Sequence, residues 1–340
     1  MNKQQQIDIA ELAQRFSLTN ELKNSCVLVT GATGLLGQIL VRLCIALNHR
    51  NHANIQIVAL ARNEEKAKQL FEGEEVAICL HSFDSPIEWE GDVDYVFHCA
   101  SPTASKFFVT SPVETINMVS EATNCILRFC KEKGVRSCVY LSSLEVYGEI
   151  LDDTIALTEN RGGPLDSLSP RSSYSLGKRM MECLCASYAK EYGVPVRIAR
   201  LAQTFGAGVE VTDQRVFAHF AHSILKGQDI VLLSSGELSR CYCYTTDAIE
   251  ALFYILLRGE VGKAYNVANE RTYISVRDMA QKVIDDFAPQ LCVRFEQPKE
   301  DCGFSPVTKL RLDTTALRLL GWRPHLDLHE MYARFLESCK

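Results

Sequence analysis

The chain has 340 residues, of which 47% are hydrophobic and 23% charged, and its formal net charge is −6. This composition is typical of a globular protein with one large core or two joined ones, and its mild acidity argues against nucleic acid or an anionic membrane as the main partner. No segment reaches about 18 consecutive apolar residues, so no membrane-spanning helix is expected. The N-terminal segment is polar and lacks the apolar part of a secretory signal, so we expect a cytoplasmic location.

Short apolar runs alternate with helical stretches along most of the chain. Continuous apolar strands that alternate with helices are typical of a parallel sheet covered on both faces. The sequence therefore predicts a doubly wound α/β fold of the Rossmann type. The predicted strands are residues 26–30, 55–60, 76–80, 93–99, 137–141, 194–201 and 263–267, and the predicted helices are 35–47, 111–133 and 175–192.

The sequence becomes more irregular after about Gly206, in residues 209–240 and 270–340. We interpret these segments as a smaller C-terminal substrate-binding domain at the carboxyl edge of the sheet, where ligands of such folds bind. The predicted dinucleotide-binding domain comprises residues 1–205 and about 241–268, with a helical extension at 1–24. The predicted substrate domain comprises residues 206–240 and 269–340.

The fourteen cysteines and the histidines do not predict a metal site. Most cysteines lie in apolar segments, where a thiol behaves as a small hydrophobic group. The C-x-C pairs that begin at Cys183 and Cys241 differ from the paired C-x-x-C spacing of zinc sites, and His219 and His222 have no third ligand beside them. A reducing compartment fits this pattern better than a disulfide framework.

The segment GATGLLG, residues 31–37, directly follows the first strand and opens the first helix. Glycines in this position permit a tight turn and close approach of the backbone to a pyrophosphate, while the helix N-terminus supplies N–H donors. The alternative is a purely structural turn. In this strand–turn–helix context the motif predicts a dinucleotide site formed by Gly31, Thr33, Gly34, Leu35, Leu36 and Gly37.

The second strand ends in Ala61, Arg62 and Asn63, where a site that prefers NAD usually offers a carboxylate to the ribose. The guanidinium of Arg62 makes a 2′-phosphate tolerable. We therefore expect NAD(P) as the cofactor, with NADP(H) slightly favoured over NAD. The alternative is that Arg62 is a solvated surface charge.

The segment YSLGK places Tyr174 and Lys178 four residues apart, on one face of a helix. A phenol with a pKa of about 10 is a poor base at neutral pH. A neighbouring ammonium group and a positive nicotinamide both favour the phenolate, so Tyr174 becomes a usable acid or base, and Lys178 is placed to bind the nicotinamide ribose. The spacing is common by chance, but here it follows a dinucleotide loop and a strand that ends in Ser142 and Ser143.

These segments together resemble the extended short-chain dehydrogenase/reductase family, which contains nucleotide-sugar epimerases, dehydratases and decarboxylases. The resemblance extends from about residue 25 to 335, and within the family it is strongest to UDP-glucuronate decarboxylases. It is carried by GATGLLG, VDYVFHCASPTAS (93–105), LSSLEVYGE (141–149), PRSSYSLGK (170–178), ARLAQTFGAG (199–208), SRCYCYTTDAIEA (239–251) and LGWRP (320–324).

The resemblance implies roles for several residues. Ser143 is implied as the hydroxyl that polarises a sugar oxygen, Tyr174 as the base and Lys178 as its partner. Arg240 is implied as the clamp on the nucleotide diphosphate, a role suited to a fork of donors. The further implied contacts are Asp84 to adenine, Ala100 and Ser101 to the cofactor, and Gln203, Arg215 and Arg311 to the nucleotide-diphosphate sugar.

The chain departs from the family pattern around the sugar. Gln203 replaces the usual asparagine, Ala202 an aromatic residue and Ala207 a proline, while Gly208 stands where decarboxylases carry arginine. Because these positions line the sugar nucleotide in the family, the sequence leaves the base and the sugar open.

Glu145 is the other candidate catalytic residue. A carboxylate in a hydrophobic turn is costly unless it is paired or has a function, although a structural acid that holds a loop is the alternative. Leu144 stands where dTDP-glucose dehydratases carry aspartate, which disfavours 4,6-dehydration. The leading hypothesis is an epimerase or decarboxylase that recycles its cofactor through a 4-keto sugar.

Three other functions stay open. They are an NADPH-dependent 4-keto-sugar reductase, a 4,6-dehydratase and, as the least favoured, a noncatalytic NAD(P)-sensing protein. The predicted helices 111–133 and 175–192 match those that form the dimer interface of the family, so a homodimer is expected.

Overall fold

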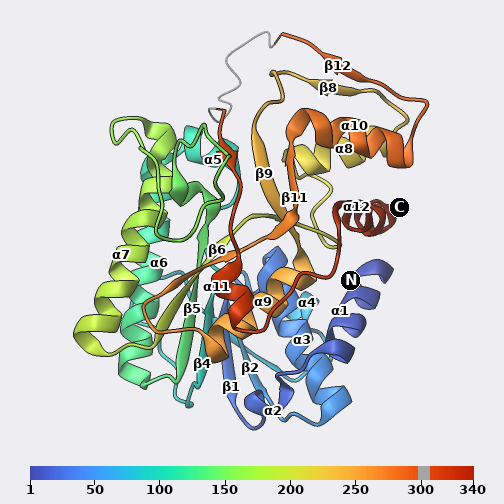
Figure 1. The fold of residues 1–340 in the computed structure, drawn as a ribbon. Coiled ribbons are helices and arrows are strands. Elements are labelled where there is room, and N and C mark those ends of the chain that lie inside the picture. Colours follow the sequence, from blue (N-terminus) through green and yellow to red (C-terminus); the bar gives the residue numbers. More distant parts are fainter. Residues whose placement is uncertain (298–306) are drawn as a thin grey trace.

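A seven-stranded parallel sheet forms the centre of the computed structural model, which describes residues 1–297 and 307–340 (Figure 1). The strand order β10-β6-β5-β4-β1-β2-β3 is that of a doubly wound fold, as predicted. All predicted strands are present, and their ends differ from the prediction by a residue or two. They are β1 (Cys26–Thr30), β2 (Gln56–Ala61), β3 (Val76–Leu80), β4 (Tyr95–His98), β5 (Ser137–Ser143), β6 (Val196–Leu201) and β10 (Ala264–Val267).

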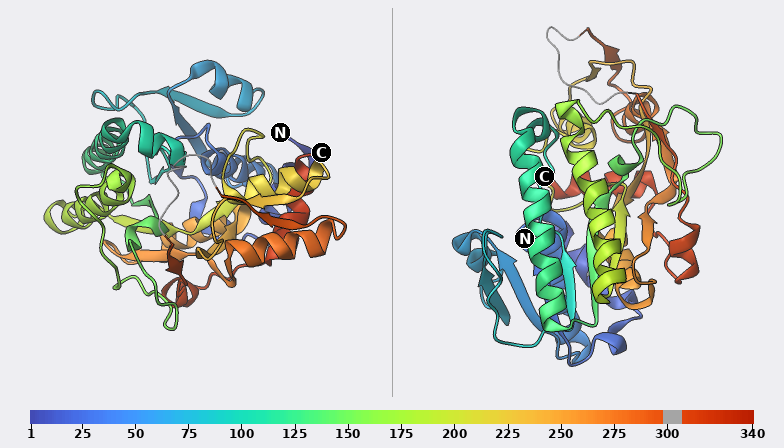
Figure 2. Two further views of the ribbon diagram at one scale, coloured as in Figure 1. Left: turned by 90° about the horizontal axis from the view of Figure 1, so that it is seen from above. Right: turned by 90° about the vertical axis from the view of Figure 1, so that its left-hand side faces the viewer.

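Helices cover both faces of this sheet, and alternate residues of each strand point into the two opposite cores. Val27 and Val29 of β1 pack with α1 (Lys3–Arg15), α3 (Leu35–Asn51) and α9 (Thr245–Arg258). Leu28 packs on the other face with α6 (Pro112–Lys133) and α7 (Ser173–Tyr192), which run side by side (Figure 2). A buried parallel strand is therefore apolar on both faces, which is why the sequence runs are continuous.

A second, smaller unit lies beyond the carboxyl edge of the central sheet (Figure 1). Its sheet contains β7 (Gln203–Phe205), β9 (Ser239–Tyr244), β11 (Asn269–Ser275) and β13 (Lys309–Leu310). The rings of Phe205, Phe217 and Phe335 pack together in its core. Its other elements are β8 (Ile230–Leu232), β12 (Val293–Phe295), α8 (Val216–Leu225), α10 (Val276–Phe287) and α12 (Leu328–Ser338).

The chain passes between the two units more than once. After β9, which belongs to the smaller sheet, the chain returns to the central sheet to form β10, and it then goes back to the smaller sheet with β11. Leu317 of α11 (Thr315–Leu319) and Trp322 pack in the core that covers the central sheet. We therefore keep the proposed domain division but assign residues 315–322 to the dinucleotide side.

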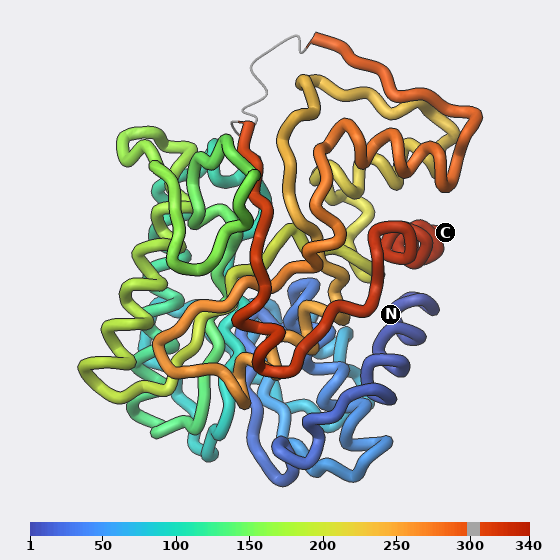
Figure 3. Tube along the Cα trace, viewed as in Figure 1, coloured from blue at the N-terminus to red at the C-terminus, as the bar shows by residue number. Residues whose placement is uncertain are grey.

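The two ends of the chain lie close together (Figure 3). The Asn2 side-chain amide donates a hydrogen bond to the Ser338 carbonyl at 3.2 Å. Short helices complete the fold: α2 (Thr19–Leu22), α4 (Glu64–Leu70), α5 (Ser105–Thr110), η1 (Leu144–Tyr147) and η2 (Pro170–Ser172). Within residues 1–297 and 307–340, no helix has the length and apolar character needed to cross a membrane.

Candidate active site

A cavity of about 560 Å³ opens at the carboxyl ends of the central strands. This is the edge at which doubly wound sheets bind ligands. Most of the residues predicted for the site line it, although they come from distant parts of the sequence. They are Gly31, Thr33, Gly34, Leu35, Leu36, Gly37, Arg62, Ala100, Ser101, Ser143, Glu145, Tyr174, Lys178, Gln203, Arg215 and Arg240.

The glycine loop after β1 leaves no room for side chains. Gly31 has a left-handed backbone conformation with φ of +62°, and a Cβ atom there would lie 2.9 Å from the Ala100 nitrogen. A Cβ atom on Gly37 would lie 2.2 Å from the Gly31 carbonyl oxygen. The loop therefore brings bare backbone to the N-terminus of α3, which is the arrangement that binds a pyrophosphate. The residues present fit a dinucleotide.

The far end of the cavity is lined by two cationic side chains. Arg62 follows β2 as predicted, and Lys66, which sequence reasoning missed, joins it from α4. Both side chains are exposed, and the Lys66 Nζ lies 3.5 Å from a carboxylate oxygen of Glu210. Lys66 lies in the first turn of α4, only four residues after Arg62, and this closeness in the chain is the signal that could have identified it.

Asp84, the predicted adenine contact, does not line the cavity. Its carboxylate instead accepts hydrogen bonds from the hydroxyls of Ser82 and Ser85 at the surface. Ser82 and Phe83 line the cavity in its place, because the turn after β3 points them inward. Phe83 has φ of 72°, an uncommon conformation for a bulky residue that is often found at functional sites.

Ser143, Tyr174 and Lys178 converge at the middle of the cavity. The side chains of Ser143 and Ser101 lie close enough to the Tyr174 hydroxyl to lower its pKa. Its ring stacks on Phe108 with the centroids 4.2 Å apart and the planes 6° from parallel. Lys178 donates from Nζ to the Leu141 carbonyl at 2.7 Å. Packing therefore fixes the tyrosine, and the end of β5 fixes the lysine.

The pKa of Tyr174 differs from the expectation of a lowered value. Burial raises this pKa and the Glu145 carboxylate raises it further, while hydrogen bonds with Ser143 and Ser101 and the charge of Arg215 act in the opposite direction. Burial also lowers the pKa of Lys178 to about 8. In the protein alone the phenol is thus neutral, and a positive nicotinamide is the further charge that favours its ionisation.

Glu145 lies on η1, immediately after the strand that carries Ser143. Its backbone N–H donates to the Ser143 hydroxyl at 3.2 Å, which fixes the two residues relative to each other. One carboxylate oxygen accepts a hydrogen bond from the Ser175 hydroxyl at 3.2 Å and lies 3.7 Å from an Arg171 nitrogen. The carboxylate is therefore held in place and remains at the cavity wall.

The three arginines predicted for the diphosphate have different surroundings. Arg240 lines the cavity, and its Nε is buried without a hydrogen-bond partner among the residues that the structure describes. Arg215 also lines the cavity, but Asp213 accepts hydrogen bonds from its guanidinium at 2.6 and 3.0 Å. Arg311 is exposed and lies outside the cavity lining. Arg240 is thus the arginine best placed for an anionic ligand.

A largely buried ion pair lies beside β5. Glu182 accepts hydrogen bonds from Ser142 at 2.6 Å and from Arg200 at 2.7 and 3.0 Å. Arg200 also donates to the Glu159 carbonyl at 2.8 Å. This ion pair supports the β5 strand next to Ser143. Sequence reasoning missed it because its members come from α7 and β6.

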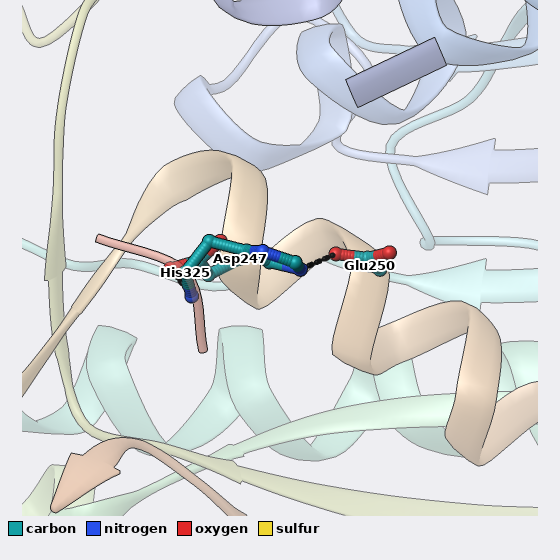
Figure 4. Close-up of side chains that lie close together, drawn as sticks. All are labelled: Asp247, Glu250 and His325. Atoms are coloured by element: carbon teal, nitrogen blue, oxygen red, sulfur yellow. Dashed lines mark hydrogen bonds and ion pairs between the residues drawn. The ribbon is translucent and has the colours of Figure 1, made fainter. Parts of the chain in front are cut away.

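One cluster away from the cavity has the spacing of metal ligands. Asp247 and Glu250 of α9 lie beside His325, whose Nε2 is 3.3 Å from a Glu250 oxygen (Figure 4). Arg15 of α1 pairs with the same carboxylates, at 2.9 Å from Asp247 and 3.2 Å from Glu250. The guanidinium already pairs with both acids, so the cluster is an ion-pair network that joins α1 to α9.

The fold, the glycine loop and the Tyr–Lys pair define a dinucleotide-dependent enzyme of the extended short-chain dehydrogenase/reductase type. The model of the NAD dependent epimerase/dehydratase family matches residues 27–268, and the chain belongs to this family.

Several individual proteins are similar to this chain. UDP-glucuronic acid decarboxylase 6 of Arabidopsis thaliana is 28% identical over 307 residues, which are 90% of this chain and 86% of that protein. UDP-glucuronic acid decarboxylase 1 of Danio rerio is 26% identical and covers 89% of this chain and 70% of its own length. The crystal structure of UDP-glucose 4-epimerase from Thermotoga maritima, 20% identical, matches with a TM-score of 0.76 over 92% of this chain and 98% of that chain. This last similarity concerns the fold alone.

Proposed function

We propose that this enzyme is a nucleotide-sugar epimerase or decarboxylase that recycles a tightly bound nicotinamide cofactor through a transient 4-keto sugar. The observation that carries the proposal is the position of Tyr174. Its hydroxyl lies with Ser143 inside a cavity that runs from the glycine loop to Arg240. The glycine loop, the acid–base pair and Arg240 thus share one cavity, as transfer between a dinucleotide and a sugar nucleotide requires.

The chain's own residues divide the chemistry between them. A bound NAD(P) supplies the hydride acceptor and donor. Ser143 donates a hydrogen bond to the oxygen at C4 of the sugar, and Tyr174 takes and returns its proton. Lys178, held at the Leu141 carbonyl, adds positive charge beside the phenol. Arg240 binds the diphosphate with its fork of donors.

The choice of epimerisation or decarboxylation over dehydration rests on Leu144. Leu144 is buried and gives no proton donor at the cavity wall, whereas Glu145 is held beside Tyr174. A 4-keto sugar permits loss of CO2 from C5 or return of the hydride to the other face of C4. The relatives whose names are UDP-glucuronic acid decarboxylase favour the first of these outcomes.

The second candidate is an NADPH-dependent 4-keto-sugar reductase. It is favoured by the two cations, Arg62 and Lys66, at the end of the cavity where a 2′-phosphate would lie. The same observation supports NADP(H) as the preferred cofactor. A noncatalytic NAD(P)-sensing protein is the least favoured alternative, because the chain retains both Tyr174 and Lys178.

Measuring the cofactor balance separates the first two functions. A thermal-shift panel first identifies which UDP-, GDP-, CDP- or dTDP-sugars, 4-keto forms included, stabilise the protein. The purified protein is then incubated with these sugars, and product and NADPH are followed together. Product without net NADPH consumption supports the recycling enzyme, and one NADPH consumed per product supports the reductase. Turnover that persists unchanged in Tyr174→Phe would remove the catalytic role of this residue and with it both mechanisms.

We also propose that the enzyme is a homodimer that pairs through α6 and α7. These helices run side by side on one face, and they carry the exposed apolar side chains Val113, Ile116 and Met180. Light scattering at micromolar protein tests this, and a monomeric mass would contradict it.

A further inference from the structure

Helix α1 lies outside the part of the chain matched by the family model, yet it is built firmly into the structure. Ile9, Leu12 and Phe16 are buried in the core beneath the central sheet, and the Phe16 ring packs edge-on against Phe253 with the centroids 5.1 Å apart. At its C-terminal end Arg15 pairs with Asp247 of α9. The helix is therefore a fixed element and not a loose extension.

The same helix carries a buried carboxylate, Asp8, whose side chain is only 3% exposed. One of its oxygens accepts hydrogen bonds from Arg334 at 2.7 Å and from Gln4 at 2.8 Å. The other accepts from the Tyr244 hydroxyl at 2.5 Å. Burial and the Asp8 charge raise the pKa of Tyr244, so the phenol stays protonated and acts as the donor.

The Tyr244 hydroxyl also serves as an acceptor, and this second bond leads to the cavity. The backbone N–H of Ala207 donates to it at 3.3 Å. Ala207 belongs to the turn 206–208, which continues β7, and Gln203 and Thr204 of β7 line the cavity. A hydrogen-bonded path therefore runs from Asp8 through Tyr244 to the turn 206–208, and β7 directly precedes this turn.

A second contact from α1 reaches the same turn. Gly208 has φ of +97°, and a Cβ atom there would lie 2.3 Å from the Gln5 side-chain nitrogen and 3.5 Å from a Leu35 methyl carbon. Gln5 is buried, and its Nε2 has no hydrogen-bond partner within the described part of the chain. Its amide thus fills the space between the turn and Leu35, the first residue of the helix after the glycine loop.

We infer that Asp8 is a positioning residue for the sugar-nucleotide site: through Tyr244 it fixes the turn 206–208 and thereby Gln203. This inference rests on the proposed function, because it assigns β7 to the sugar nucleotide. The relay touches the sugar side of the cavity and bypasses the catalytic trio. Its loss therefore weakens binding of the sugar nucleotide, while the chemical step and dinucleotide binding are retained.

Tyr244→Phe is the sharpest test, because it removes one hydroxyl and keeps the ring. We expect KM for the nucleotide sugar to rise about three- to tenfold, as for the loss of a buried hydrogen bond, with kcat and the Kd of NAD(P) unchanged. Asp8→Asn retains an acceptor for Tyr244, so its KM rises less than that of Asp8→Ala. Hydrogen exchange in residues 203–208 is faster in Tyr244→Phe, and exchange in residues 31–37 is unchanged.

Two control variants separate positioning from general loss of stability. Glu11→Gln removes a charge from the same helix and an exposed partner of Arg334 without altering the relay, so KM stays at the wild-type value. Phe16→Leu weakens the packing of α1 far from the relay, so it lowers Tm and leaves KM unchanged.

The outcomes distinguish failure of the positioning role of Asp8 from failure of the proposed function. Wild-type KM and wild-type exchange in Tyr244→Phe would overturn the positioning role alone, as would a parallel rise of KM and of the NAD(P) Kd. A wild-type protein that converts no nucleotide sugar would overturn the proposed function. In that case hydrogen exchange in residues 203–208 still decides whether the relay fixes the turn.

Discussion

The Glu145 carboxylate opposes ionisation of the Tyr174 phenol. Burial raises the pKa of Tyr174, and the negative charge of Glu145 raises it further. The two residues come from η1 and α7, and the bond between the Ser175 hydroxyl and Glu145 joins these elements. If Tyr174 is the base, as we propose, an acid beside it opposes the first proton transfer, and we propose that Glu145 acts later in the reaction.

Glu145→Gln tests this role. The amide retains the shape and an acceptor for Ser175, but it cannot hold or give up a proton. We expect kcat to fall about 100-fold or more, as for loss of a general acid or base, with binding of the nucleotide sugar intact. Steady-state kinetics and calorimetric binding measure the two quantities, and Glu149→Gln in the following loop is the control. Unchanged turnover would leave Glu145 with a structural role only.

The cations Arg62 and Lys66 lead to a prediction about cofactor choice. Arg62→Ala and Lys66→Ala should each weaken NADP(H) binding about tenfold, because each removes a charge-assisted bond to the 2′-phosphate. The Kd of NAD should stay constant, since NAD has no phosphate there. Tryptophan fluorescence titration gives both constants. Equal loss of NAD and NADP(H) affinity in these variants would contradict the assignment.

Because Glu182 and Arg200 form a buried pair, substitutions of the two residues should have non-additive effects on the free energy of unfolding. Glu182→Met leaves the Arg200 charge buried and partly unpaired, and we expect a loss of about 3 kcal/mol in the free energy of unfolding. The double variant with Arg200→Met should recover part of this loss, because no lone charge remains. Urea unfolding of both single variants and the double variant completes the cycle. Additive losses would show that the pair is not coupled.

His98 predicts sensitivity to acid. Its ring is buried, with Nδ1 2.8 Å from the Thr30 hydroxyl and Nε2 3.3 Å from that of Thr123. Burial lowers its pKa from 6.5 to about 3, so between these values the unfolded chain binds a proton that the native protein does not. Stability should therefore fall as the pH falls below about 6.5, by up to about 1.4 kcal/mol per pH unit.

Urea unfolding at several pH values tests this slope. His98→Gln should show a shallower dependence than the wild type, because glutamine does not titrate. The matched control is His49→Gln at an exposed position, which should retain the wild-type slope. Equal slopes in the wild type and in His98→Gln would contradict the prediction.

Local patterns in the sequence were enough to predict the parallel sheet, and they named many of the residues that line the cavity. Short runs of consecutive apolar residues predicted the strands. The glycine loop and the Tyr174–Lys178 pair could each be recognised from a few neighbouring residues. These residues follow strand ends or helix starts, and the carboxyl ends of parallel strands meet at one edge. For that reason the predicted residues that follow β1, β2, β4 and β5 line one cavity together with those at the start of α7.

Contacts between residues that are far apart in the sequence could be learned only from the tertiary structure. The turn after β3 brings Ser82 and Phe83 to the cavity and leaves Asp84 outside, a matter of side-chain direction that composition does not encode. Asp213 neutralises Arg215, whereas Arg240 remains available to an anion. The relay from Asp8 to Tyr244 joins residues 236 positions apart. Such pairs depend on which elements pack together, and no local pattern records that packing.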